Sequence, residues 1–214
     1  CGSIIAYIKS RSSPGQQDTQ TIFKGERYAY AYAKRYGIAF ALAVVGLVGF
    51  PNRVLASVRC VGNITNQTIQ DSVVVPAGAT CTLTDVYVTG NIRINAGGSL
   101  SLNGGTVDGN IHGNNASLFF MAPDGANSPV TVNGRVHMLN VASVEMSRGT
   151  VNGNFIASQN GSIGISGTTF GRNLVISSTV KSITVLGAAI GDDLTILDNP
   201  ATIFVASNTV ARSL

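Results

Sequence analysis

The sequence predicts an all-β protein, a right-handed parallel β-helix of about seven turns, and three observations predict it. The stretch GGTVDGNIHG (104–113) returns as RGTVNGNFIA (148–157) and, less closely, as VYVTGNIRIN (86–95). From residue 72 onward the chain aligns with itself in units of about nineteen residues, and a fixed period of this length is typical of a solenoid. Within each unit apolar and polar residues alternate, which is the periodicity of strands and not of helices.

Four positions of the unit are apolar in every turn, so we expect them to form the core. Stacking at the ~4.8 Å spacing of paired strands would place the members of each column above one another, and right-handedness is the usual coil of parallel connections. The predicted columns are Val73, Ile92, Ile111, Val136, Phe155, Leu174, Leu194; Cys81, Leu100, Leu118, Val144, Ile163, Ile183, Ile203; Leu83, Leu102, Phe120, Met146, Ile165, Val185, Val205; and Val88, Val107, Val132, Val151, Phe170, Ile190, Val210.

A ladder of amides is expected at one corner, where each Asn follows a Gly. We expect the Gly to supply unusual backbone angles and the Asn to bond turn backbone and the Asn above, a structural role and not a catalytic one. The ladder is Asn91, Asn110, Asn154, Asn173 and Asp193, interrupted by Arg135.

A second polar column carries a hydroxyl in every unit: Thr80, Ser99, Ser117, Ser143, Ser162, Ser182 and Thr202. Such a column could be a catalytic serine array, but a hydroxyl at the start of a strand more often satisfies corner backbone, and we expect that role. The outward column between the inward ones is predicted to read Thr82, Ser101, Phe119, Glu145, Gly164, Thr184, Phe204.

The N-terminal quarter has the pattern of an export signal. In residues 34–56 two cations precede an apolar run from Gly37 to Phe50, and small residues follow, which predicts a secretory signal peptide cleaved after Ala56. The run is shorter than the ~20 residues of a membrane span; the alternative is a retained anchor, which would be the only membrane contact. Residues 1–33 are polar and without pattern, and no Met precedes Met121, so we expect a misplaced or truncated start of the reading frame there.

Two cysteines fall in the exported part, and an even pair in an oxidising compartment predicts a disulfide. Cys60 and Cys81 are about one turn apart, which matches the Cα separation that a disulfide tolerates. We expect the bridge to hold residues 57–71 as an N-terminal cap over a β-helix of residues 72–214. The predicted location is secreted, or in the cell envelope or periplasm.

The charge distribution argues against nucleic-acid binding. Residues 1–56 contain seven Lys or Arg and two acids, a net charge of +5, whereas residues 57–214 contain seven and eight, a net charge of −1. The repeat domain therefore has no field that would steer phosphates.

The motif of Val, any residue, Gly-Asn and an apolar residue resembles the rungs of bactofilins, and the whole region 60–214 resembles the right-handed parallel β-helix of pectin-lyase-like proteins. Bactofilins polymerise end to end inside cells; this chain differs by its export signal and its cysteine pair. The resemblance to pectin-lyase-like enzymes implies a site of clustered carboxylates on one outward face, and GDD (191–193) is similar to the paired aspartates of polygalacturonases.

Candidates for chemistry are few. Asp192 and Asp193 are weak catalytic candidates because the His element IHG (111–113) would lie four turns away, whereas a general acid and base must flank one bond. His112 and His137 fall one turn apart, but no carboxylate or thiolate completes a metal site, so we expect no metal and no cofactor.

The third unit is six residues longer than the others, and loops on solenoids often carry recognition. Phe119, Met121 and Pro123 could form a contact patch there, with a harmless insertion as the alternative. We expect a secreted, non-catalytic structural, adhesive or self-associating module of a bacterial cell surface, with the C-terminal rung and cell-surface polysaccharide as partners. The alternative is a polysaccharide lyase or glycoside hydrolase on the same scaffold.

Overall fold

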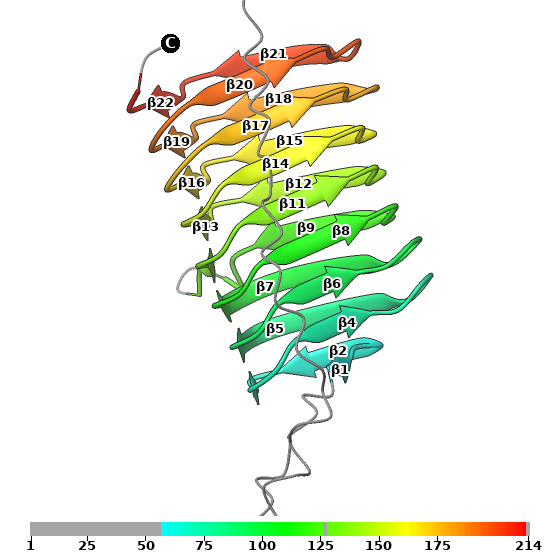
Figure 1. Cartoon of the computed structure of the whole chain (residues 1–214). Helices are drawn as coiled ribbons and strands as arrows, with labels where there is room; N and C mark the ends of the chain where they lie inside the picture. Colours follow the sequence, from blue (N-terminus) through cyan, green and yellow to red (C-terminus); the bar gives the residue numbers. More distant parts are fainter. Residues whose placement is uncertain (1–56, 126–127, 213–214) are drawn as a thin grey trace, which may run out of the picture. The chain divides into compact units, whose positions relative to one another are not determined.

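The computed structural model describes residues 57–125 and 128–212, and within them the chain is a parallel β-solenoid (Figure 1). The predicted leader (1–33) and signal peptide (34–56) lie outside the described residues. None of the described residues forms a helix, so none forms one long and apolar enough to cross a membrane.

One strand of every turn belongs to an eight-stranded sheet, which we call sheet A, and all its pairs are parallel. Figure 1 shows these strands stacked from one end of the solenoid to the other. Sheet A consists of β1 (Val58–Arg59), β4 (Val73–Val75), β6 (Ile92–Ile94), β8 (Ile111–Asn114), β11 (Val136–Leu139), β14 (Phe155–Ser158), β17 (Leu174–Ser177) and β20 (Leu194–Leu197).

The other strands form a fourteen-stranded sheet, sheet B, which contains two rows. The long strands β5 and β7 run through both rows. In later turns a corner separates the two rows, so each turn contributes one strand to each. The first row is β2 (Gly62–Thr65), β5 (Thr80–Val88), β7 (Ser99–Val107), β9 (Leu118–Ala122), β12 (Ser143–Ser147), β15 (Ser162–Ser166), β18 (Ser182–Leu186) and β21 (Thr202–Ala206). The second row adds β3 (Thr68–Ile69), β10 (Val130–Val132), β13 (Thr150–Val151), β16 (Thr169–Phe170), β19 (Ala189–Ile190) and β22 (Thr209–Val210).

The structure has eight turns instead of about seven because residues 58–69 form a turn of their own. We expected this segment to be a cap lying across the first rung. Instead β1 pairs with β4, and β2 and β3 pair with β5, all in parallel register. The Cys60–Cys81 disulfide joins this first turn to the second, with the two Cα atoms 5.5 Å apart.

The four predicted inward columns line the core, two of them with an error in the third unit. A fifth inward column in sheet A was not predicted, and its members Val75, Ile94, Met138, Ala157 and Ile176 are fully buried. Phe119 and Met121 occupy the places expected for Leu118 and Phe120, and both are fully buried. The seven-residue interval from the first inward column to the start of the next strand is kept in this turn (Ile111 to Leu118), as it is from Ile92 to Ser99. A shift by one residue exchanges the two faces of a strand, so this register buries Phe119 and Met121 and turns Leu118 and Phe120 outward.

The same shift corrects the hydroxyl column. Leu118, not Ser117, pairs with Ser99 and Ser143. Ser117 lies in the preceding corner, where its hydroxyl donates to the carbonyl oxygen of Gly97 (3.1 Å). The other six hydroxyl residues stand in register.

The Asn corner is bonded from turn to turn by side-chain oxygens. The backbone N–H of Asn110 donates to Oδ1 of Asn91 (2.8 Å), and that of Arg135 donates to Oδ1 of Asn110 (2.9 Å). Higher in the stack, the N–H of Asp193 donates to Oδ1 of Asn173 (3.1 Å). Arg135 has no side-chain oxygen that could accept the next bond of the ladder, but its backbone N–H still donates to Asn110.

The glycines before this corner are needed for a different reason from the one expected. Gly90, Gly109, Gly134 and Gly153 have no positive φ. A Cβ on Gly153 would stand 2.6 Å from the carbonyl oxygen of Gly134, so close stacking of turns excludes a side chain. Left-handed angles occur instead at other corners, mostly at residues with polar side chains: Asn115, Asn140, Gln159, Ser178 and Asp198 after sheet A.

Candidate functional site

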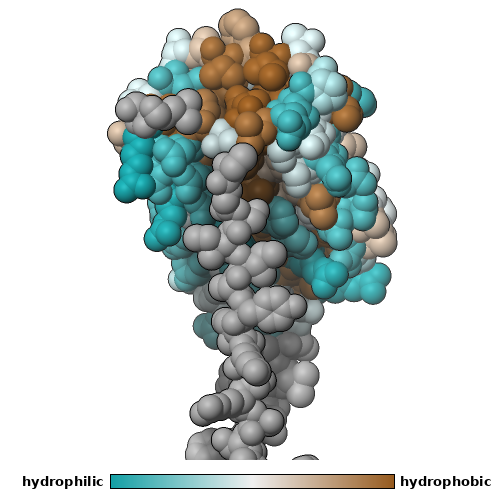
Figure 2. All heavy atoms as spheres, turned by 45° about the horizontal axis from the view of Figure 1, so that its top comes forward, coloured by the Kyte–Doolittle hydropathy of each residue, from teal (hydrophilic) through white to brown (hydrophobic). Residues whose placement is uncertain are grey.

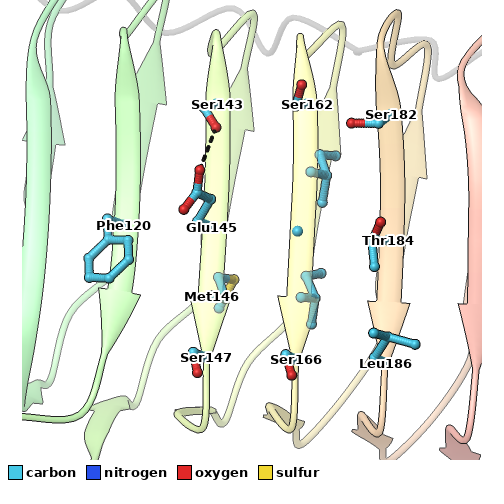
Figure 3. Close-up of a pocket in the computed structure, with 13 residues that line it drawn as sticks. Phe120, Ser143, Glu145, Met146, Ser147, Ser162, Ser166, Ser182, Thr184 and Leu186 are labelled. Carbon is cyan, nitrogen blue, oxygen red and sulfur yellow. Dashed lines mark hydrogen bonds between the residues drawn. The ribbon is translucent and has the colours of Figure 1, made fainter.

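A shallow groove crosses the outward face of sheet B over β12, β15 and β18, with Phe120 of β9 at one end (Figure 3). It encloses about 370 Å³. We call it the Gly164 groove, and its lining residues are Phe120, Ser143, Glu145, Met146, Ser147, Ser162, Ile163, Gly164, Ile165, Ser166, Ser182, Thr184 and Leu186.

The floor of the groove exists because one outward position has no side chain. The outward column reads Phe120, Glu145, Gly164 and Thr184 in successive strands. Gly164 has no positive φ, and a Cβ added to it would meet only Cγ of Glu145, at 4.0 Å. The backbone therefore does not require glycine at this position, in contrast to the corner glycines.

Two rows of hydroxyls border the floor. Ser143, Ser162 and Ser182 stand in register on one side, and Ser147 and Ser166 on the other. Figure 3 shows the hydroxyl of Ser143 pointing toward Glu145, to whose Oε1 it donates at 3.2 Å. Glu145 is the only charged residue among the lining residues, so the groove carries a negative charge and no cation.

The predicted contact patch in the longer third unit is wrong for two of its three residues. Phe119 and Met121 are core residues with no exposed surface, and only Pro123 is half-buried near the surface. The aromatic side chain that faces outward here is Phe120, and it lies at the groove. Phe120 was assigned to the core in the sequence because its unit was read one residue out of register.

The two aspartates proposed as catalytic candidates start the last turn. Asp193 directly precedes β20, four strands away from β8 and its His112 in sheet A. No group of three His, Cys, Asp or Glu residues that could hold a metal occurs among the residues described. The backbone N–H of Asp193 donates to Oδ1 of Asn173, as expected for its place in the Asn column.

A carboxylate on the second row of sheet B has well-defined partners. Tyr87 donates its hydroxyl to Oδ2 of Asp108, and Asn133 donates Nδ2–H to Oδ1 (2.8 Å). These two hydrogen bonds, that of Tyr87 first, lower the pKa of Asp108. Asn152 continues the row by donating to Oδ1 of Asn133 (2.8 Å).

The last turn of the described structure exposes apolar positions that are buried in the six turns before it, from β5 to β18. Ile203 and Val205 are 46% and 40% exposed, whereas Ile183 and Val185 beneath them are fully buried. We call this surface, Ile203 and Val205 with the free edge of β21, the end face; Phe204 and Leu197 of the same turn are also exposed, but they stand in outward columns. Figure 2 shows apolar side chains gathered at this end of the solenoid.

Comparisons with protein-family models, with curated proteins and with solved structures found no match to this chain. The resemblance to pectin-lyase-like proteins and to bactofilins therefore has no support from a relative, and the fold class that the structure shows is a parallel β-solenoid.

Proposed function

We propose that this chain is an exported, non-catalytic adhesive module of a bacterial cell surface that binds a neutral polysaccharide along the Gly164 groove. The observation that carries the proposal is the groove itself: hydroxyls of three successive turns around a floor opened by a glycine that the backbone does not need.

The chemistry of the groove suits a sugar chain. Side-chain hydroxyls and a carboxylate can exchange hydrogen bonds with sugar hydroxyls, and Phe120 offers an apolar ring for the C–H face of a pyranose. Strands repeat at ~4.8 Å, close to the length of one sugar unit, so a chain running along the stack would meet a serine hydroxyl in each of the turns of Ser143, Ser162 and Ser182.

The charge of the groove selects the class of polysaccharide. Glu145 would repel the carboxylates of uronic acids, and no Lys or Arg lines the groove to offset it. We therefore expect binding of neutral glycans in preference to acidic ones. An open, shallow site of this kind gives weak affinity for one sugar and gains from several engaged at once.

Affinity electrophoresis of the protein in gels with neutral, amino-sugar and acidic polysaccharides tests the proposal. We expect a neutral glycan to retard the wild-type protein. Gly164→Val fills the floor of the groove and should weaken binding at least tenfold, and Glu145→Gln should also weaken it. Thr82→Val is the matched control, because Thr82 lies in the same outward column two turns before Phe120.

Equal retardation of the wild type and Gly164→Val would contradict the proposal. Turnover of a polysaccharide that disappears in Asp192→Ala or Asp193→Ala would establish the enzymatic alternative instead.

The export part of the proposal rests on the signal pattern of residues 34–56 and is supported by the disulfide. Intact-mass measurement of secreted material should give Ser57 as the first residue and no free thiol at Cys60 or Cys81. A species that keeps residues 34–56 would indicate a membrane-anchored protein.

We also propose that the end face associates with a second copy of the chain. Among the described strands β21 is paired on one side only, which leaves its backbone groups beside the exposed side chains of Ile203 and Val205. Self-association would give an adhesive module several glycan sites in one particle.

A further inference from the structure

The outward face of sheet A holds two histidines side by side. His112 of β8 and His137 of β11 are direct partners in the parallel ladder, and their ring centroids are 5.0 Å apart with the ring planes tilted by 52°. Both side chains are half-buried, and neither makes a side-chain hydrogen bond with another described residue. The sequence contains two histidines in all, so the chain places both imidazoles at this one position.

The separation of the rings agrees with that of two imidazoles bound to one metal ion. With metal–nitrogen bonds of ~2.1 Å and an angle between square-planar and tetrahedral, the two ring centroids are roughly 4.5–5.2 Å apart. The strand ladder on both sides fixes the two Cα atoms in register, so the pair is already organised before an ion arrives.

The ring of His137 is held in the neutral form that binds metals. Burial, the neighbouring His112 and then Arg135 lower the pKa of His137, so its ring is uncharged at neutral pH. The next residues in the column are Arg93 on one side and Ile156 on the other. The arginines repel a cation and the isoleucine adds no ligand, which limits the affinity.

We propose that His112 and His137 together bind one Cu²⁺ ion, with water in its remaining positions. Among divalent first-row ions Cu²⁺ binds nitrogen ligands most tightly and accepts square-planar coordination, so it needs the fewest protein ligands. Structural Zn²⁺ sites use four protein ligands, and no carboxylate or thiolate forms a group of three with this pair among the described residues.

Titration of the full chain with a Cu²⁺ salt at pH 7.4, followed by calorimetry and electron paramagnetic resonance, tests the proposal. We expect one equivalent bound with micromolar affinity and a spectrum with two nitrogen ligands from imidazole. His112→Gln and His137→Gln should each weaken binding at least tenfold, and acidification to pH 5 should release the ion because protons compete for the rings.

Two further variants distinguish this site from other copper ligands, such as the N-terminal amine: His112→Gln/His137→Gln removes both imidazoles, and Ile156→His adds one. Ile156→His places a third imidazole in the column and should tighten binding more than tenfold. One-equivalent binding of unchanged affinity in His112→Gln/His137→Gln, or no gain in Ile156→His, would overturn the proposal. Circular dichroism of each variant without metal checks that the fold is kept.

Discussion

At the scale of single residues, the most informative side chain is a buried amide. Asn160 has no exposed surface, and its Oδ1 accepts the backbone N–H of Val141 at 2.8 Å while its Nδ2–H donates to the carbonyl oxygen of Met138 at 3.3 Å. Both backbone groups belong to the turn before, so the amide joins two turns inside the stack. Asn199 makes the equivalent bond with the N–H of Thr179 (2.7 Å) two turns later.

We expect Asn160→Ala to destabilise the solenoid by about 2 kcal/mol, because it leaves a buried N–H without its partner. Urea denaturation followed by circular dichroism measures this loss as a lower midpoint. Asn133→Ala is the matched control: Asn133 is exposed, and its loss should cost less than about 0.5 kcal/mol. Equal midpoints for the two variants would mean that water replaces the amide of Asn160.

The residue scale also shows where sequence reasoning was limited. The Gly-Asn repeat can be recognised in the sequence. Its glycines are required because the backbone of the preceding turn approaches too closely for a Cβ, and this contact exists only in the folded stack. Gly164 carried no signal, because a glycine that makes a groove reads like any other Gly in a strand. Its role follows from the neighbours that stacking supplies: Glu145 on one side and Thr184 on the other.

At the scale of the elements, the first turn depends on its covalent link. The strands β1, β2 and β3 are short, and among the described strands they have a neighbour on one side only. In a solenoid each turn is stabilised by its neighbours. The bridge from Cys60 to Cys81 closes a loop with a sequence separation of 21.

Replacing both cysteines by Ser should destabilise the first turn by about 3 kcal/mol, the loop-closure value for a loop of this size. Hydrogen exchange should then show faster exchange at 58–69, while 174–190 stays as protected as in the wild type. Uniform loss of protection along the chain would instead show that the solenoid unfolds as one unit. Reduction of the wild-type protein serves as a second route to the same comparison.

The elements were largely predictable because the inward columns repeat so regularly. The first column, from Val73 to Leu194, stands in the expected register in every turn. The error arose at LFFMA (118–122), where five apolar residues in a row contain no alternation to fix the register. The first turn was missed because it lacks the four-residue corner that precedes Thr80 in the second.

At the scale of the whole molecule, the described part of the stack has one end at which apolar side chains are exposed. Ile203 and Val205 continue inward columns that are dry in the turns below, and β21 is paired on one side only among the described strands. A sheet edge with exposed apolar side chains promotes pairing with another chain unless charges block it. In the first turn Cys60 and Ile69 are buried, although Val61 is exposed.

We therefore expect a tail-to-tail dimer through the end face, formed as the concentration rises, with filaments if the first turn also opens. Sedimentation velocity over a concentration series should show a monomer converting to a dimer. Ile203→Lys and Val205→Lys should keep the protein monomeric, because a lysine at the end face would have to be buried against its own copy. Thr195→Lys is the matched control: it adds the same charge in the same turn, but on the outward face of sheet A. A wild type that stays monomeric at every concentration, or a dimer equally strong in Ile203→Lys and Thr195→Lys, would show that the end face does not bind a second copy.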